Sequence, residues 1–220
     1  MAILLIRHGE TAGNRNRIVQ VPETPLSERG LLQAEQLGRR LAAEPIAEIW
    51  SSHLMRAHQT AQAIERTTRA PLAIHADLEE RNFGDLRGTP YSELQVDPFV
   101  ANFDPPGGEG WNAFHERVDR TWERIERHWY DQYARPGRAG HLVIVSHGLF
   151  LRSLLERRLL TAELLARFGD GEGRVTIGNT AVTRVAPAPA LGAVHAIELL
   201  ACIAHLADDA ATPAPRNGQI

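Results

Sequence analysis

Arg7 and His8 are the first residues of the chain whose types and spacing could do chemistry. They follow residues 2–6, a short apolar run without a period, which is typical of a strand buried on both faces. Open α/β sheets bind their ligands at the carboxyl ends of such strands. Arg7 would suit phosphate or carboxylate with its planar fork of donors, and His8 could act as a nucleophile or carry a proton. The alternative interpretation is a surface strand end with two solvated polar side chains.

His147 stands in the same position after a second apolar run, residues 142–145. If both runs form parallel central strands, the imidazoles of His8 and His147 lie in one crevice. Ser146 comes directly before His147, but it lacks the flanking glycines of a nucleophile elbow. The pattern therefore disfavours a Ser-His-Asp hydrolase.

A guanidinium and a carboxylate elsewhere in the chain could complete such a site. Arg56 begins a predicted helix directly after a predicted strand, so its side chain and the first amides of the helix could face the crevice. Glu79 and Glu80 lie in an irregular segment, where one carboxylate near several arginines could act as a general acid. The alternative for each of these residues is a solvated surface side chain.

The ten histidines also raise the question of a metal site. Conceivable ligand spacings occur for His8 with Glu10, for His53 with His58 and for His141 with His147. Arg7 and Arg56 would repel a cation from the predicted crevice, and no HExxH or paired-cysteine motif occurs. We therefore predict neither a metal nor another cofactor.

The elements that would position these residues alternate between strands and helices. Strands are expected at residues 2–6, 46–50, 71–75, 142–145, 175–177, 181–185 and 194–199. Helices are expected from a Ser27 N-cap to residue 43, with Leu31, Ala34, Gly38 and Leu41 on one face, and over residues 55–68, 111–133, 148–157 and 162–168. The alternation predicts an α/β fold with a mostly parallel central sheet.

Residues 76–110 break this alternation, because they are rich in glycine, proline and acidic residues. Loops of this length are often lids or binding loops. We expect residues 1–207 to form a single domain that contains this lid-like segment. Residues 208–220 are expected to form a flexible tail.

The composition excludes several classes of function. The chain has 220 residues, a net charge of -3 and a pI near 6.4, so a nucleic-acid partner is not expected. Its single cysteine, Cys202, cannot form an internal disulfide, which fits a reducing compartment. No apolar run reaches membrane-spanning length, and no basic region precedes the first apolar run as in a signal peptide. The default expectation is a cytoplasmic protein without a membrane partner, with an edge strand that could support a homodimer.

With these motifs taken together, the chain resembles the histidine phosphatase superfamily, also called the phosphoglycerate-mutase-like family. The matching residues, in the order of the family, are Leu5-Ile6-Arg7-His8-Gly9-Glu10-Thr11, Asn14, Pro25-Leu26-Ser27-Glu28-Arg29-Gly30, Ser51-Ser52-His53-Leu54-Met55-Arg56-Ala57-His58-Gln59-Thr60-Ala61, Leu78-Glu79-Glu80 with Phe83-Gly84, Val145-Ser146-His147-Gly148 and Asn179-Thr180-Ala181-Val182. Each motif alone is weak evidence, whereas all of them in order span nearly the whole chain. The resemblance implies a three-layer α/β/α sandwich with a mostly parallel sheet.

The resemblance also implies a mechanism without a metal. His8 would attack phosphorus and carry the phosphoryl group as a phosphohistidine. Glu80, four residues before Gly84 as in the family, would protonate the leaving oxygen and then activate water. The equatorial oxygens would be held by Arg7, Asn14, Arg56 and His147.

We therefore expect a phosphatase that acts on small phosphomonoesters, with a small phosphorylated metabolite or inorganic phosphate as its ligand. The alternative is a phosphoglycerate-mutase type of transfer, which must retain an acidic product. Between Glu80 and Gly110 the only cations are Arg81 and Arg87, and the chain contains no lysine, which favours release and hydrolysis. A non-catalytic member of the fold that binds a phosphorylated ligand is a further alternative. Phe83, Phe99, Phe103 and Trp111 could form an apolar side of the pocket.

Overall fold

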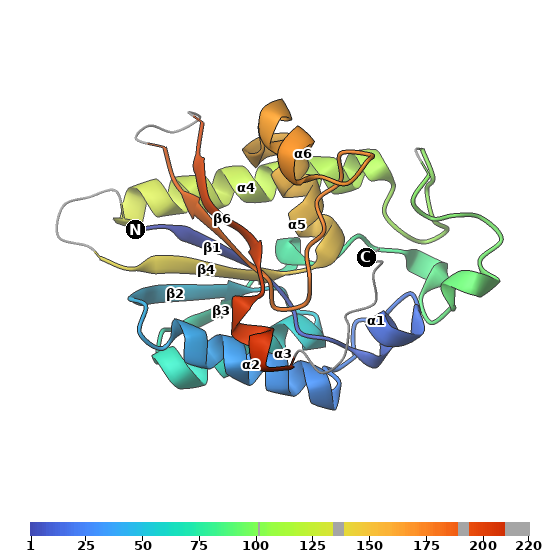
Figure 1. Ribbon diagram of the computed structural model, residues 1–220. Coiled ribbons are helices and arrows are strands. Elements are labelled where there is room, and N and C mark those ends of the chain that lie inside the picture. The colour runs from blue at the N-terminus through green and yellow to red at the C-terminus, as the bar shows by residue number, and fades with distance from the viewer. Residues whose placement is uncertain (101, 134–138, 189–193, 210–220) are drawn as a thin grey trace.

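The fold was analysed in a computed structural model, which describes residues 1–220 except 101, 134–138, 189–193 and 210–220. Its centre is a six-stranded sheet with the order β3-β2-β4-β1-β5-β6 (Figure 1). The strands are β1 (Ile3–Arg7), β2 (Ile46–Ser51), β3 (Leu72–Ile74), β4 (His141–Ser146), β5 (Val182–Ala186) and β6 (Ala196–Cys202). The expected mostly parallel sheet is confirmed, because the pairs β1–β4, β2–β4 and β2–β3 are parallel. The pairs β1–β5 and β5–β6 are antiparallel.

The two strands at the centre of the sheet, β1 and β4, carry the two histidine motifs. Every residue of both strands is buried, as expected for apolar runs covered on both faces. Their register pairs Arg7 with Ser146, so both strands end at the same level. The residues that follow, His8 and His147, are thereby brought to the same edge of the sheet.

Helices cover both faces of the sheet and make the three layers (Figure 1). One face is covered by α2 (Glu28–Leu41) and α3 (Met55–Thr68), and the other by α4 (Trp111–Tyr133) and α5 (Gly148–Leu154), whose last turn continues as a π-helix over Leu155–Leu159. The remaining helices are the short α1 (Ala12–Asn16) and α6 (Ala162–Phe168). None of the helices in the described ranges is both long and apolar enough to cross a bilayer.

The local structure differs from the elements expected from the sequence at three places. Residues 175–177 do not form a strand; Val175 and Ile177 are buried, but as irregular chain that packs on the main core. The loop after Thr11 contains α1, because Thr11 and Asn14 form a capping box at its start. On α2, Leu31 is exposed and does not belong to the buried face. That face contains Gln33 and Leu37 in addition to the expected Ala34, Gly38 and Leu41.

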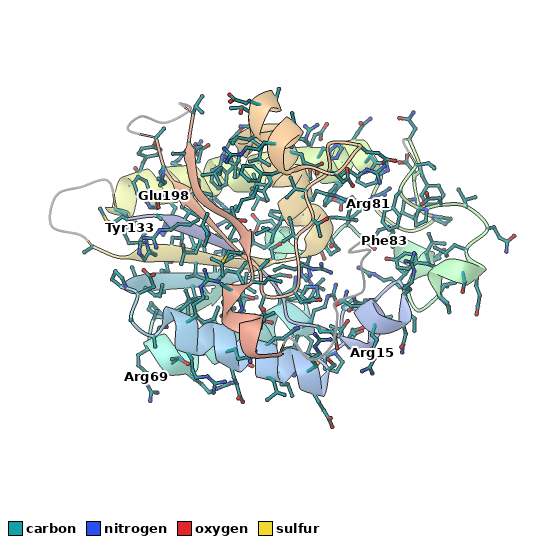
Figure 2. The ribbon with its side chains drawn as sticks, viewed as in Figure 1. Arg15, Arg69, Arg81, Phe83, Tyr133 and Glu198 are labelled. Atoms are coloured by element: carbon teal, nitrogen blue, oxygen red, sulfur yellow. The ribbon has the colours of Figure 1, made fainter. Side chains whose placement is uncertain are left out.

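Residue 101 aside, the segment of residues 76–110 is irregular, as expected, and its described residues form three short 3-10 turns: Ala76–Leu78, Gly84–Leu86 and Tyr91–Glu93. Arg81 holds it together from inside. Its guanidinium donates to the carbonyls of Glu109, Pro98 and Phe103, and lies 3.9 Å from the ring centroid of Trp111. Arg81 and Phe83 mark this segment in Figure 2. A lid-like movement of the segment stays a prediction.

The C-terminal boundary is only partly visible. A 3-10 turn, Ala204–Asp209, extends two residues into the predicted tail, and residues 210–220 lie outside the described chain. The single-domain interpretation of residues 1–207 stays a prediction.

Candidate active site

His8 is held at the carboxyl end of β1 with one ring nitrogen free. Its backbone N–H donates to Ser146 O at 3.0 Å, and the Thr180 N–H donates to the carbonyls of Arg7 and His8. The ring Nδ1 lies 2.7 Å from Gly9 O. Because a carbonyl only accepts, Nδ1 must carry the proton, which leaves the lone pair of the neutral ring on Nε2.

The electrostatic surroundings keep His8 neutral. The ring is almost completely buried, and burial disfavours the imidazolium. Burial first, and then the positive charges of Arg56 and Arg7, lower the pKa of His8 well below its ordinary value. A neutral imidazole with a free Nε2 is the form that can act as a nucleophile.

Arg7 and Arg56 present donors to the same cavity that no protein group satisfies. Arg7 donates through Nη1 to Ile177 O at 2.6 Å, and Arg56 donates through Nη1 to Val21 O at 3.2 Å. The Nε of each is buried without a hydrogen-bond partner. Burial, despite the nearby Glu80 carboxylate, lowers the pKa of Arg7 and lowers that of Arg56 to about 10. In the described residues, neither guanidinium forms an ion pair with a carboxylate; the hydrogen bonds of both go to backbone carbonyls.

His147 lies beside His8 from the neighbouring strand β4. The two ring centroids are 5.1 Å apart. His147 Nε2 lies 2.8 Å from Ser52 Oγ, and its Nδ1 is buried without a partner. Burial and the charge of Arg56 lower the pKa of His147 well below its ordinary value. Because Ser52 Oγ already accepts from the Leu54 N–H, its own hydroxyl is free to donate to Nε2.

Glu80 occupies the opposite wall of the cavity. Its carboxylate accepts three backbone N–H groups: Oε1 from Arg81 and Phe150, and Oε2 from Leu149. These bonds fix both oxygens at the start of α5. The neighbouring Glu79 does not line the cavity; its carboxylate lies 3.8 Å from His53 Nε2. The choice of Glu80 over Glu79 therefore agrees with the geometry of the cavity.

Asn14 reaches the cavity from α1. Its Oδ1 accepts from the backbone N–H of Thr11 at 3.2 Å and from Asn179 Nδ2 at 3.3 Å. In the described residues, all hydrogen bonds of this side chain are formed by Oδ1, so Nδ2 is available as a donor. Asn179 also donates to His8 O at 3.0 Å, which ties α1 to the histidine strand.

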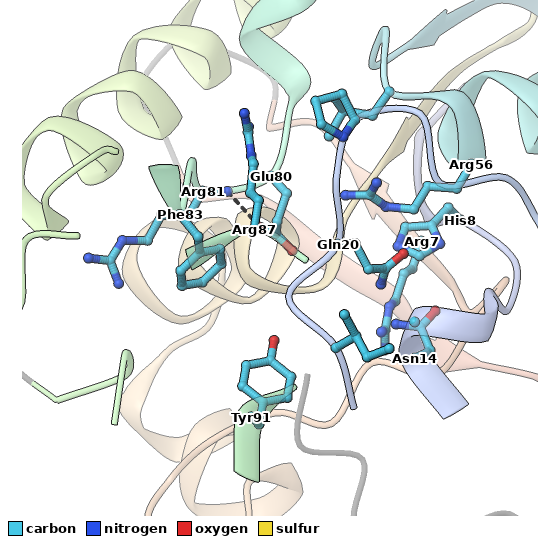
Figure 3. A pocket seen from close by; sticks show the side chains of 14 residues that line it. Arg7, His8, Asn14, Gln20, Arg56, Glu80, Arg81, Phe83, Arg87 and Tyr91 are labelled. Carbon is cyan, nitrogen blue, oxygen red and sulfur yellow. Dashed lines mark hydrogen bonds between the residues drawn. The ribbon is translucent and has the colours of Figure 1, made fainter. Parts of the chain in front are cut away.

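Figure 3 shows how these side chains converge from elements far apart in the chain. The cavity is lined by Arg7, His8, Asn14, Arg56 and Glu80 of the predicted set, and by Gly13, Ile18, Gln20, Pro22, Leu54, Arg81, Phe83, Arg87 and Tyr91. His147 is not part of the lining, but its ring lies 5.1 Å from that of His8. All six predicted site residues are therefore brought together.

The expectation of an apolar side was wrong for three of its four residues. Only Phe83 lines the cavity. Phe99 packs edge-on against Phe83 at 6.0 Å, and Trp111 covers Arg81. Phe103 contributes its carbonyl to Arg81.

Three residues that contribute to the site had not been predicted to do so: Gln20, Ser52 and Tyr91. Gln20 Oε1 accepts from Thr11 Oγ1 at 2.8 Å, so its amide nitrogen is available to the cavity. Tyr91 faces the cavity with its hydroxyl (Figure 3). Ser52 could have been suspected as a small polar residue at the end of β2, whereas nothing in the sequence around Tyr91 indicates a site.

The arrangement suits the binding and transfer of an anionic group with several oxygens. Buried polar atoms are almost always hydrogen-bonded in proteins, so three buried nitrogens without partners beside one cavity indicate a missing ligand. The Nε atoms of Arg7 and Arg56, together with Asn14 Nδ2, can donate hydrogen bonds to phosphoryl oxygens. The free His8 Nε2 lies among them as an electron-pair donor.

Comparison with known proteins gives consistent matches. A family model described as "Histidine phosphatase superfamily (branch 1)" matches residues 3–197. A metal-independent phosphoserine phosphatase of Arabidopsis thaliana is 35% identical over 169 residues, which cover 70% of this chain and 67% of that protein. The fructose-2,6-bisphosphatase TIGAR of Xenopus tropicalis is 38% identical over 137 residues, 57% of this chain, but the match spans only 50% of that protein. The crystal structure of a putative alpha-ribazole-5'-P phosphatase from Escherichia coli superposes with a TM-score of 0.73 and 26% identity, and covers 93% of this chain and 98% of that one.

Proposed function

Because the chain belongs to the histidine phosphatase superfamily, we propose that it hydrolyses small phosphomonoesters through a phosphoryl group carried on His8. One observation carries the proposal: the unprotonated Nε2 of a neutral His8 stands among buried arginine donors that have no partner. A phosphoryl group would satisfy those donors and present its phosphorus to Nε2.

The first step is an in-line displacement. The lone pair of His8 Nε2 forms the new P–N bond while the bond from phosphorus to the ester oxygen breaks. Glu80 enters the step as the neutral acid and donates its proton to the departing oxygen, so the leaving group departs as an alcohol. The backbone N–H groups that bind both oxygens of Glu80 would hold the carboxyl group in place and then stabilise the carboxylate that remains.

The second step returns the enzyme to its starting state. Glu80, now a carboxylate, takes a proton from water as the water oxygen attacks phosphorus. The P–N bond breaks, its electrons return to Nε2, and inorganic phosphate leaves. Glu80 ends protonated, and His8 ends neutral with its proton still on Nδ1.

The remaining residues act on the phosphoryl oxygens. Arg7 and Arg56 would neutralise the charge on the equatorial oxygens, and Asn14 Nδ2 would donate a further hydrogen bond. His147 would donate from Nδ1 if Ser52 supplies the hydrogen to Nε2. Because these groups are fixed before substrate arrives, little reorganisation is needed in the transition state.

Hydrolysis is favoured over mutase transfer by the scarcity of cations that could retain an acidic product. Of the two arginines after Glu80, Arg81 is committed to three backbone carbonyls, and only Arg87 lines the cavity with a free guanidinium. A comparison of phosphate release from a panel of phosphomonoesters with interconversion of 2- and 3-phosphoglycerate tests this choice. Phosphate release as the dominant reaction supports the phosphatase, interconversion supports the mutase, and neither reaction supports the non-catalytic alternative. The cytoplasmic location and the homodimer stay predictions.

A further inference from the structure

Arg87 is a cation in the cavity that has no role in the proposed transfer of the phosphoryl group. It lines the cavity at the end of the Gly84–Leu86 turn and is half-buried. Its guanidinium makes no hydrogen bond or ion pair with any residue in the described part of the chain. It is close enough to Arg56 that its charge contributes to lowering the pKa of Arg56. A half-buried guanidinium that repels its neighbour and lacks a counter-ion indicates an anion that is supplied by the ligand.

The charges of the cavity lead to the same conclusion. Its lining contains four arginines and a single acidic residue, Glu80. Arg81 donates away from the cavity to backbone carbonyls, which leaves Arg7, Arg56 and Arg87. A phosphomonoester carries about two negative charges above a pKa of about 6. Such a dianion offsets Arg7 and Arg56, and the Glu80 carboxylate is held by backbone N–H groups rather than by Arg87, so Arg87 is left without a counter-ion.

Tyr91 adds a second free donor to the lining of the cavity. Burial and the Glu80 carboxylate raise the pKa of Tyr91 to about 12, so the hydroxyl keeps its proton. The hydroxyl faces the cavity and has no partner among the described residues (Figure 3). Residues 87–91 therefore form a wall of the cavity that supplies a cation and a further hydrogen-bond donor, which suits an anionic ligand.

This wall is fixed before ligand arrives. The N–H of Val19 donates to Thr89 O at 3.0 Å, and the N–H of Gly88 donates to Val19 O at 2.7 Å. The N–H of Tyr91 donates to Arg17 O at 2.8 Å. These bonds clamp the residues on both sides of Arg87 to the loop after α1. The backbone of this wall is therefore ordered before ligand binds, and only the side chains must be ordered on binding.

We propose that Arg87 binds a second anionic group on the alcohol part of the substrate, a carboxylate or a further phosphoryl group. This inference rests on the proposed function and narrows its substrate class. The preferred substrates are phosphomonoesters whose leaving alcohol is itself an anion, and Arg87 is the residue that selects them.

The experiment compares kcat/KM for matched substrates that differ by one charge. For the carboxylate the pair is 3-phosphoglycerate and glycerol 3-phosphate; for the phosphoryl group it is fructose 1,6-bisphosphate and fructose 1-phosphate. The wild type is expected to prefer the charged member of at least one pair, and the pair with the larger preference identifies the group. Arg87→Gln is expected to lower that preference about tenfold, the effect of one charge-assisted hydrogen bond. Arg87→Lys should retain part of it.

Arg66→Gln is the matched control, because Arg66 is exposed on α3 and far from the cavity lining. It should keep the preference of the wild type. Equal losses on both members of a pair in Arg87→Gln, or a wild type without any preference for the charged members, would overturn the inference while leaving the phosphatase intact. A wild type that hydrolyses none of the four esters would overturn the proposed function as well.

Discussion

The imidazole rings of His8 and His147 lie 5.1 Å apart at the ends of two neighbouring parallel strands, and among the described residues neither ring has a carboxylate partner. Two rings so close, with Arg7 and Arg56 around them, cannot both be protonated in a buried cavity. The protein therefore maintains a neutral nucleophile next to positive charges. The same charges that prevent protonation of His8 attract the phosphoryl group.

The first prediction concerns the protonation of these rings. In the ligand-free protein both histidines should titrate below the ordinary value of 6.5, because burial and the two guanidiniums disfavour the imidazolium. A bound phosphate dianion should raise the pKa of His147, since a negative charge favours its protonated form. NMR titration of the imidazole protons with and without inorganic phosphate measures both effects. A midpoint at or above 6.5 for His8 without phosphate would contradict the electrostatic argument.

The second prediction concerns stability against pH. In the unfolded chain His8 regains a pKa near 6.5, whereas its folded pKa is lower, so unfolding takes up a proton between the two values. The free energy of unfolding should therefore fall as the pH drops below 6.5, by about 1.4 kcal/mol for each unit of pKa shift. Urea unfolding at pH 7.5 and pH 5.5 measures the change. His8→Gln should show a smaller loss than the wild type, and an identical loss would remove His8 as a cause.

The third prediction separates the role of Glu80 from that of Glu79. Glu80→Gln cannot donate a proton, so its activity on alkyl phosphates should fall by about 10²- to 10⁴-fold. The kcat/KM for an aryl phosphate such as p-nitrophenyl phosphate should fall far less, because it reflects only the formation of the phosphoenzyme and that alcohol leaves without a proton. Steady-state kcat/KM for both esters gives the comparison. Glu79→Gln is the matched control and should affect both weakly; equal losses on both esters in Glu80→Gln would exclude the acid role.

The fourth prediction concerns Arg81, which is 2% exposed and donates to three carbonyls of the irregular segment. Arg81→Leu leaves those buried carbonyls unsatisfied, which should cost about 3 kcal/mol of unfolding free energy. Arg120→Leu removes an exposed arginine of α4 and its ion pair with Glu116, and should cost less than about 1 kcal/mol. Urea unfolding compares the two. Similar costs would mean that Arg81 does not hold the segment.

The fold could be predicted where local pattern and burial agree. The continuous apolar runs of β1 and β4 and the recurrence of apolar residues every three or four positions in α4 are local signals that depend on the core alone. Residues 175–177 have the same apolar character, but their backbone bonds with no neighbouring strand, and strand pairing is not visible in a local pattern. The prediction that Leu31 lies on the buried face of α2 was wrong, because that face is set by the contact of α2 with α3 rather than by the hydrophobicity of single residues.

The site could be predicted where a residue follows a strand or belongs to an ordered motif, as His8, His147 and Arg56 do. Tyr91 and Arg87 could not, because their positions depend on the backbone bonds between residues 17–19 and 88–91. Such pairings between irregular segments leave no periodic trace in the sequence. The chemistry of phosphoryl transfer is therefore more visible in the sequence than the part of the cavity that would receive the alcohol.

The central claim is that His8 carries the phosphoryl group, and trapping that group tests it most directly. Glu80→Gln should accumulate the phosphoenzyme from p-nitrophenyl phosphate, because the variant forms it but lacks the base for hydrolysis. An alkaline quench followed by peptide mass spectrometry is expected to find one phosphoryl group on His8, lost on acid treatment and absent from Glu80→Gln combined with His8→Gln. Turnover that persists in His8→Gln, or a phosphoryl group on a different residue, would contradict the account.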